Sequence, residues 1–122
     1  MIDHVLLHVR DLDASRRFYE ASLLPLGLRV SEPAGDEIGF GDGDRDVFRI
    51  ARRDQTDNGV HLAFRSKSRG AVDRFFIEAM GSGGQDNGSP GLRKIHHANY
   101  YAAFVLDPDG NNIEAVCHES EG

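Results

Sequence analysis

The chain has 122 residues, 39% of them hydrophobic, and a formal net charge of −6 at pH 7. This length and apolar content suit a single domain with an ordinary core. The charges are dispersed and acidic overall, which excludes a basic surface for nucleic acid or an anionic membrane. The apolar runs are too short for a membrane span, and the single cysteine, Cys117, fits a reducing compartment. We therefore expect a cytoplasmic protein.

The first half of the chain has the pattern of a strand, a helix and three short strands. Alternating apolar residues predict a strand over 2–10. Asp11 or Asp13 provides an N-cap for a helix that runs to about Leu24, before a proline and a glycine. Turn-rich segments separate the three predicted short strands, which cover 28–30, 37–40 and 46–51.

The second half repeats this order. A strand over 60–65 precedes a helix capped by Ser68, which ends near Gly81. The glycine-rich stretch 81–91 is expected to be irregular, a flap beside a site, because a phosphate loop would precede a helix and this one follows it. Strands dominate and each half has one helix, so the fold class is α+β. The last two strands, a predicted hairpin, cover 100–106 and 113–116.

The two halves align with each other. A shift of 57 residues places His4 on His61, and a shift of 65, which allows for the longer loop of the second copy, places Arg49 on Glu114. Two copies indicate a duplicated, pseudo-symmetric domain, since a solenoid needs at least three. These four residues are therefore expected to form a site between the copies. The alternative for the two histidines is a purely structural position at a strand edge.

His4, His61 and Glu114 have the side chains that bind a divalent metal ion while leaving coordination positions open. His8 is also a histidine of the first strand, but four residues of strand place it about 13 Å from His4. Both cannot bind one ion, so His8 is expected to line the pocket or to be partly exposed.

His97 and Tyr100 are candidates for acid–base catalysis, because they follow the glycine-rich stretch where a substrate can meet them. Imidazole exchanges protons near neutral pH, and a phenol near a metal ion becomes more acidic. For Tyr100, packing at the start of a strand is the alternative. His118 lies beside an acidic tail and is assigned no function.

Three segments of the chain resemble the vicinal oxygen chelate superfamily. The opening strand and helix, 3–19, resemble its first module, and 60–64 resemble the first strand of its second module. The segment 103–114, which includes Asp-Pro-Asp-Gly-Asn-Asn, resembles its terminal hairpin. The superfamily includes glyoxalase I, bleomycin resistance proteins, fosfomycin resistance transferases and extradiol dioxygenases. The resemblance implies one domain over 1–118, made of two βαβββ modules (1–56 and 57–118), and a tail over 119–122.

The resemblance also implies a function. His4, His61 and Glu114 match the family's ligands for a divalent ion such as zinc, nickel, manganese or ferrous iron. The ion would bind the vicinal oxygens of a small-molecule substrate in a lyase, isomerase or dioxygenase reaction, in a site that a homodimer completes. Glu114 would also take part in catalysis, with His97 or Tyr100 moving the proton. The alternative is a metal-free binding protein that resembles bleomycin resistance proteins.

Arg49 departs from the glyoxalase I pattern. Glyoxalase I has a fourth ligand, a glutamate, at this position, and a permanently cationic guanidinium cannot replace it. The four-ligand site is therefore not reproduced. Three roles remain open for Arg49: it binds an anionic group of the substrate, it pairs with Glu114 in place of the metal, or it points into solvent.

Overall fold

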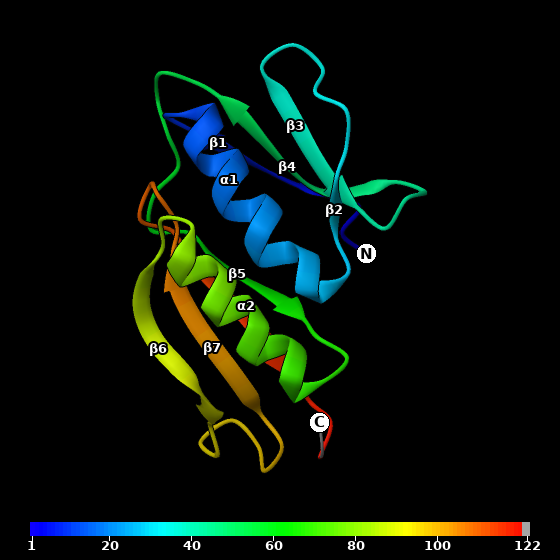
Figure 1. Cartoon of the computed structure of the whole chain (residues 1–122), viewed down its shortest axis with the longest axis vertical. Helices are drawn as coiled ribbons and strands as arrows, with labels where there is room; N and C mark the ends of the chain where they lie inside the picture. Colours follow the sequence, from blue (N-terminus) through cyan, green and yellow to red (C-terminus); the bar gives the residue numbers. More distant parts are fainter. Residues whose placement is uncertain (121–122) are drawn as a thin grey trace.

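Two sheets of four strands, each with one helix, make up the part of the chain that the computed structural model describes, residues 1–120 (Figure 1). The last two residues of the expected tail lie outside this range. The α+β fold with two βαβββ modules is confirmed. The first module contains β1 (Val5–Val9), α1 (Leu12–Leu23), the 3₁₀ turn η1 (Leu24–Leu26), β2 (Arg29–Val30), β3 (Glu37–Gly41) and β4 (Asp46–Arg52). The second contains β5 (His61–Arg65), α2 (Arg69–Gly81), β6 (Gln85–Leu92), β7 (Tyr101–Leu106) and β8 (Asn112–Cys117).

The two sheets have the same topology, and the central residues of their strands are paired in the same register. Their strand orders are β1-β4-β3-β2 and β5-β8-β7-β6, and in each the first pair is parallel and the others are antiparallel. Leu6 pairs with Arg49, and Ala63 pairs with Glu114. These pairs are related by the shifts of 57 and 65 residues. Arg49 and Glu114 therefore occupy equivalent positions in the two sheets.

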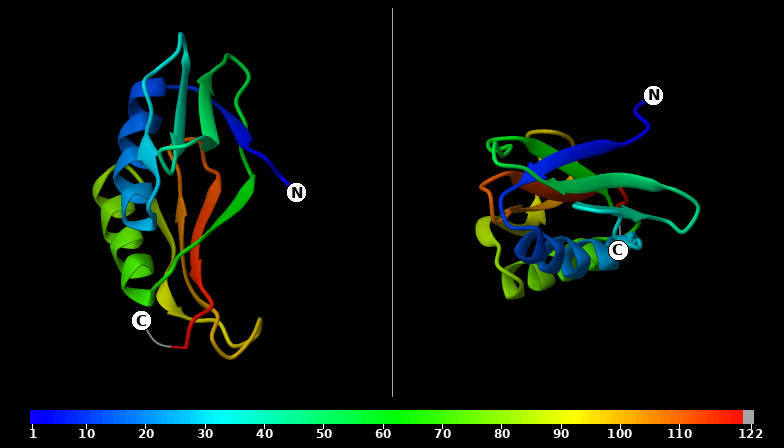
Figure 2. Two further views of the ribbon diagram at one scale, coloured as in Figure 1. Left: turned by 90° about the vertical axis from the view of Figure 1, so that its right-hand side faces the viewer. Right: turned by 90° about the horizontal axis from the view of Figure 1, so that it is seen from above.

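Both helices lie side by side on the same side of the sheets (Figure 2). Asp11 caps α1 by accepting a hydrogen bond from the amide of Ala14, and Ser68 caps α2 through Ala71. In the described part of the chain, neither helix is long and apolar enough to span a membrane. The helices bury one face of each sheet, and within residues 1–120 no helix covers the opposite face. The largest core side chains between the helices and the sheets are Phe18, Tyr19, Phe40, Phe48 and Phe75.

The prediction of an irregular stretch over 81–91 is wrong. Helix α2 includes Gly81, and β6 pairs with β7 from Gln85 to Leu92. Two register shifts interrupt this pairing, around Gly88. Strand β6 lies at the edge of its sheet, where a proline and two glycines are tolerated because one side of the strand needs no hydrogen-bonding partner. The strand pattern is therefore hidden by a composition that is typical of loops.

A buried hydrogen-bond network joins the two modules at the turn between β7 and β8. Asp107, only 4% exposed, accepts hydrogen bonds from the hydroxyl of Tyr19 on α1 and from the backbone amide of Asn111. The side chain of Asn111 accepts from the amide of Val60 and donates to the carbonyl of Asp57, both in the connection between β4 and β5. Burial and the Asp107 carboxylate raise the pKa of Tyr19 well above its ordinary value. The terminal hairpin thus fixes the position of one module against the other.

Candidate functional site

His61, Glu114 and Tyr100 meet on the uncovered face of the second sheet. Oε1 of Glu114 lies 3.0 Å from Nε2 of His61, and Oε2 accepts a hydrogen bond of 2.5 Å from the hydroxyl of Tyr100. Glu114 is 1% exposed, whereas the side chain of His61 is half exposed. The Glu114 carboxylate on the central strand β8 is thus buried, whereas its neighbour His61 is accessible to solvent. Three of the residues expected in the site are together.

The hydrogen bonds of His61 determine which of its nitrogens carries a proton. Nδ1 lies 3.0 Å from the backbone carbonyl of Asn112, and a carbonyl only accepts, so Nδ1 is protonated. In neutral His61, Nε2 then has a free lone pair directed at the Glu114 carboxylate. Two lone pairs at 3.0 Å require a positive charge between them. Either a proton makes the pair an imidazolium–carboxylate ion pair, or a metal ion binds both.

Tyr100 is held in the site by its contact with Glu114. Burial, the hydrogen bond to Glu114 and the charge of that carboxylate raise the pKa of Tyr100 to about 12. The hydroxyl therefore keeps its proton at neutral pH and acts as a donor. Of the two predicted roles, proton transfer and simple packing, the geometry is compatible with a proton donor.

Tyrosine ionisation tests this contact. All three tyrosines have raised pKa values: Tyr100 and Tyr101 about 12, and Tyr19 well above its ordinary value. We expect no rise in tyrosinate absorbance of the folded protein near pH 10 and a rise near pH 12. Because the unfolded chain releases these protons first, the free energy of unfolding should fall as the pH increases from about 10 to 12. An ordinary ionisation step near pH 10 that disappears in Tyr100→Phe would contradict the contact.

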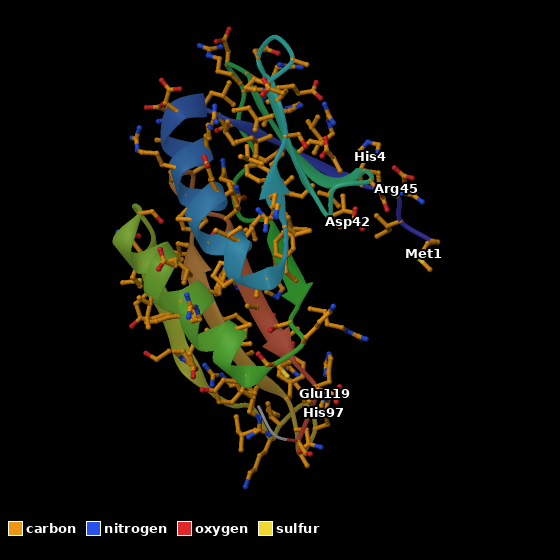
Figure 3. The ribbon with its side chains drawn as sticks, turned by 45° about the vertical axis from the view of Figure 1, so that its right-hand side comes forward. Met1, His4, Asp42, Arg45, His97 and Glu119 are labelled. Carbon is orange, nitrogen blue, oxygen red and sulfur yellow. The ribbon has the colours of Figure 1, made fainter. Side chains whose placement is uncertain are left out.

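His4 lies apart from this group. It precedes β1, which starts at Val5, so the prediction that the strand carries it is wrong. Its side chain is half exposed, and its Nδ1 lies 2.7 Å from Oδ1 of Asp3, whose pKa this hydrogen bond lowers. Figure 3 shows His4 and Arg45 in the upper part of the view, well separated from His97 near the bottom. Among residues 1–120, no three histidine, cysteine or acidic side chains converge as metal ligands, so one protomer does not unite His4 with His61 and Glu114.

The geometry at His4 nevertheless matches that at His61. The carboxylate of Asp3 only accepts, so Nδ1 of His4 carries a proton, and in neutral His4 the lone pair is on Nε2. A histidine that binds a metal through one nitrogen usually donates its other N–H to a carboxylate or a carbonyl. Both histidines meet this condition.

Arg49 forms two ion pairs within its own module. Its Nε donates to Oε1 of Glu37 at 2.7 Å, and its Nη1 donates to Oδ2 of Asp46 at 2.9 Å. The Asp46 carboxylate lies over Gly39, where a Cβ would come within 2.0 Å of it, and also accepts from Ser31. Within the protomer Arg49 therefore pairs with these two carboxylates, and it does not point freely into solvent. Its role in binding an anionic substrate stays a prediction.

His97 contacts Tyr100 and His118. The amide of Asn99 donates to Nδ1 of His97, so the proton of neutral His97 is on Nε2, which lies 2.8 Å from Nδ1 of His118. Both imidazole rings lie edge-on to the ring of Tyr100. The hydrogen bond to His118, to which the sequence assigned no function, thus fixes the orientation of His97 beside Tyr100.

Phe104 is a member of the site that the sequence analysis missed. It pairs directly with Glu114 across β7 and β8, and its ring is stacked on His61 with a centroid distance of 6.2 Å. The signal was available, because the shift of 65 residues makes Phe104 equivalent to Gly39, the neighbour of Arg49. At this position the second module has an aromatic ring beside Glu114, and the first module has a glycine beside Arg49.

A comparison with protein families identifies the chain. The sequence profile of the Glyoxalase/Bleomycin resistance protein/Dioxygenase superfamily matches residues 1–115. The chain belongs to this superfamily. No curated protein matches the chain.

Solved structures of superfamily members are similar over nearly the whole chain. A glyoxalase/bleomycin resistance protein from Albidiferax ferrireducens has 28% identity and a TM-score of 0.83, covering 94% of this chain and 97% of its own. A possible glyoxalase from Bacillus cereus has 26% identity and a TM-score of 0.66, covering 96% and 98%. A glyoxalase I mutant from Zea mays, with 19% identity and a TM-score of 0.70, matches 98% of this chain with 45% of its own length and shows the fold alone.

Proposed function

We propose that this glyoxalase superfamily protein is a metal-dependent enzyme that acts on a small molecule with vicinal oxygens. The observation that carries the proposal is the pair of lone pairs on Nε2 of His61 and Oε1 of Glu114, which face each other at 3.0 Å. Two adjacent ligands with bonds of about 2.1 Å have this separation at an angle of about 90°. The donors are the imidazole and carboxylate that zinc, nickel, manganese and ferrous iron accept.

The surroundings of the pair also suit a metal ligand set. The carbonyl of Asn112 orients His61, and the hydroxyl of Tyr100 orients Glu114, as outer hydrogen bonds commonly do for metal ligands. A divalent ion at this position would act as a Lewis acid toward the oxygens of the substrate. Glu114 is the candidate base, Tyr100 keeps its proton at neutral pH and can donate it, and His97 is the candidate for exchanging protons with solvent.

The third ligand, His4, would come from a second copy of the chain. Within one protomer His4 is far from His61, yet its Nδ1 is held by Asp3 so that Nε2 is free. A symmetric homodimer that places the uncovered face of one first module against the second module of its partner would complete two identical sites. It would also bring the guanidinium of Arg49, in its frame of two carboxylates, toward the substrate.

A metal-free binding protein is the second candidate. A proton between His61 and Glu114 satisfies the same two lone pairs by forming an ion pair. Arg49, at the position equivalent to Glu114, already provides a permanent positive charge in the first module. A protein of this type would bind its ligand on the same uncovered face without changing it.

Metal binding by the full-length protein distinguishes the two functions. We expect zinc or nickel to bind in a calorimetric titration and, at 100 times its Kd, to increase the free energy of unfolding by about 2.7 kcal/mol. His61→Ala should lose both effects, since it removes one of two paired ligands from the protomer. If wild type and His61→Ala show the same binding and the same melting temperature with and without metal, the enzyme proposal fails and the binding protein remains.

A further inference from the structure

One row of residues crosses all four strands of the second sheet on its uncovered face. Ala63 on β5 pairs with Glu114 on β8, Glu114 pairs with Phe104 on β7, and Phe104 pairs with Gly88 on β6. Residues that are directly paired across strands point to the same face. The row therefore leads from the His61–Glu114 pair, across an aromatic ring, to a position that has no side chain.

Arg93 fills the space over this glycine. A Cβ at Gly88 would lie 2.9 Å from Cδ1 of Phe104 and 3.3 Å from Nη2 of Arg93, and a Cβ at Gly91 would lie 3.0 Å from Nη1 of Arg93. The guanidinium is also held by a hydrogen bond of 2.7 Å from Nη2 to the carbonyl of Ser89, and its carbon is 5.4 Å from the centre of the Phe104 ring. The two glycines of β6 thus provide the surface on which the Arg93 side chain lies.

The charge of Arg93 is not neutralised within the described chain. Arg49 has carboxylate partners at 2.7 and 2.9 Å, whereas no acidic side chain in residues 1–120 lies within ion-pair distance of Arg93, whose one side-chain hydrogen bond goes to a backbone carbonyl. A guanidinium with free N–H groups and a fixed plane is suited to a carboxylate or phosphate group. Arg93 therefore has the geometry and the charge of an anion-binding residue.

We propose that Arg93 binds the anionic group of a small-molecule ligand, whose other end reaches His61 and Glu114. Strand spacing places Gly88 roughly 10 Å from Glu114, so the ligand spans this length, with an apolar or aromatic segment over Phe104. The position of that other end rests on the proposed function. The anion site rests only on Arg93, its glycines and Phe104.

Phenylacetate and its uncharged amide, phenylacetamide, test the proposal because they have nearly the same shape and differ in charge. We expect phenylacetate to bind the full-length protein in an NMR titration, with shifts at Phe104 and Gly88. Arg93→Gln should weaken binding about tenfold or more, to the level of phenylacetamide. Arg17→Gln, which removes the same charge from the exposed side of α1, should bind phenylacetate like wild type.

A metal ion could also bind a carboxylate, so the titration includes His61→Ala and a chelator. If Arg93 is the anion site, adding Arg93→Gln to His61→Ala weakens phenylacetate binding by the same factor as in wild type, with and without the chelator. Binding that is lost in His61→Ala but kept in Arg93→Gln would overturn the proposal while supporting the metal site. If phenylacetate binding depends on Arg93 and the protein binds no metal, this proposal is supported and the proposal of a metal-dependent enzyme is refuted. Equal binding by Arg93→Gln and wild type, or no saturable binding, overturns the proposal.

Discussion

Replacing Glu114 by glutamine is expected to reduce the affinity for zinc or nickel by more than ~100-fold. The amide preserves the size of the side chain but removes the negative charge that faces Nε2 of His61. Losing an outer hydrogen bond alone typically costs about 10–100-fold in metal affinity. Tyr100→Phe, which removes only the hydrogen bond to Oε2, should therefore fall between wild type and Glu114→Gln. Competition titration with a chromogenic chelator measures all three affinities.

His8→Ala is the control for a general effect of removing a charged or histidine side chain. His8 is a partly buried histidine of β1, and in the sequence it lies four residues from His4. The variant should bind metal like wild type. The interpretation of Glu114 as a metal ligand is refuted if Glu114→Gln retains the wild-type metal affinity, or if His8→Ala reduces the metal affinity as strongly as Glu114→Gln does.

Replacing Asp107 by alanine should have the largest effect on stability, about 3 kcal/mol or more in the free energy of unfolding. The substitution removes the acceptor of the buried Tyr19 hydroxyl and of the Asn111 amide at once. Each buried donor left without a partner costs about 1–3 kcal/mol. Because the network joins α1 to the second module, the loss affects the packing of both modules. Urea denaturation followed by circular dichroism measures the change.

Asp109→Ala is the matched control in the same turn. The amide of Arg10 donates to Oδ1 of Asp109 at a long 3.3 Å, and burial raises the pKa of this carboxyl. Removing a carboxylate that is partly desolvated should change the free energy of unfolding by less than about 1 kcal/mol. Equal destabilisation by Asp107→Ala and Asp109→Ala would show that the turn itself, and not the network between the modules, is responsible.

The duplication could be predicted from the sequence because side chains along a strand alternate strictly between its two faces. A shift of one residue would move a whole strand to the other face, so the alignments of His4 on His61 and of Arg49 on Glu114 determine which side chains share a face. In the structure Leu6 pairs with Arg49 and Ala63 pairs with Glu114, so Arg49 and Glu114 are equivalent as predicted, whereas His4 lies outside the paired part of its strand. The proximity of His61 and Glu114 follows directly, since their strands are adjacent and parallel.

Two features of the site could not be predicted in this way. The first is the position of His4, which precedes its strand. Whether His4 meets His61 and Glu114 within one chain depends on how the two sheets pack, and the periodicity of the sequence does not determine that packing. The strand β6 was hidden because the glycines that make space for Arg93 also have the composition of a loop. The glycines of β6 can be explained only from the cross-strand row of Glu114, Phe104 and Gly88, which the structure shows.

The most direct test of the account uses Glu114→Gln together with His4→Ala. Each variant alone should contain almost no metal, because each lacks one ligand in both sites of the proposed dimer. When the two chains are co-expressed and mix at random, half of the dimers contain both, and each of these has one intact site. We therefore predict that metal content recovers to about a quarter of the wild-type value. No recovery, or full metal content in His4→Ala alone, would contradict a site shared between two copies.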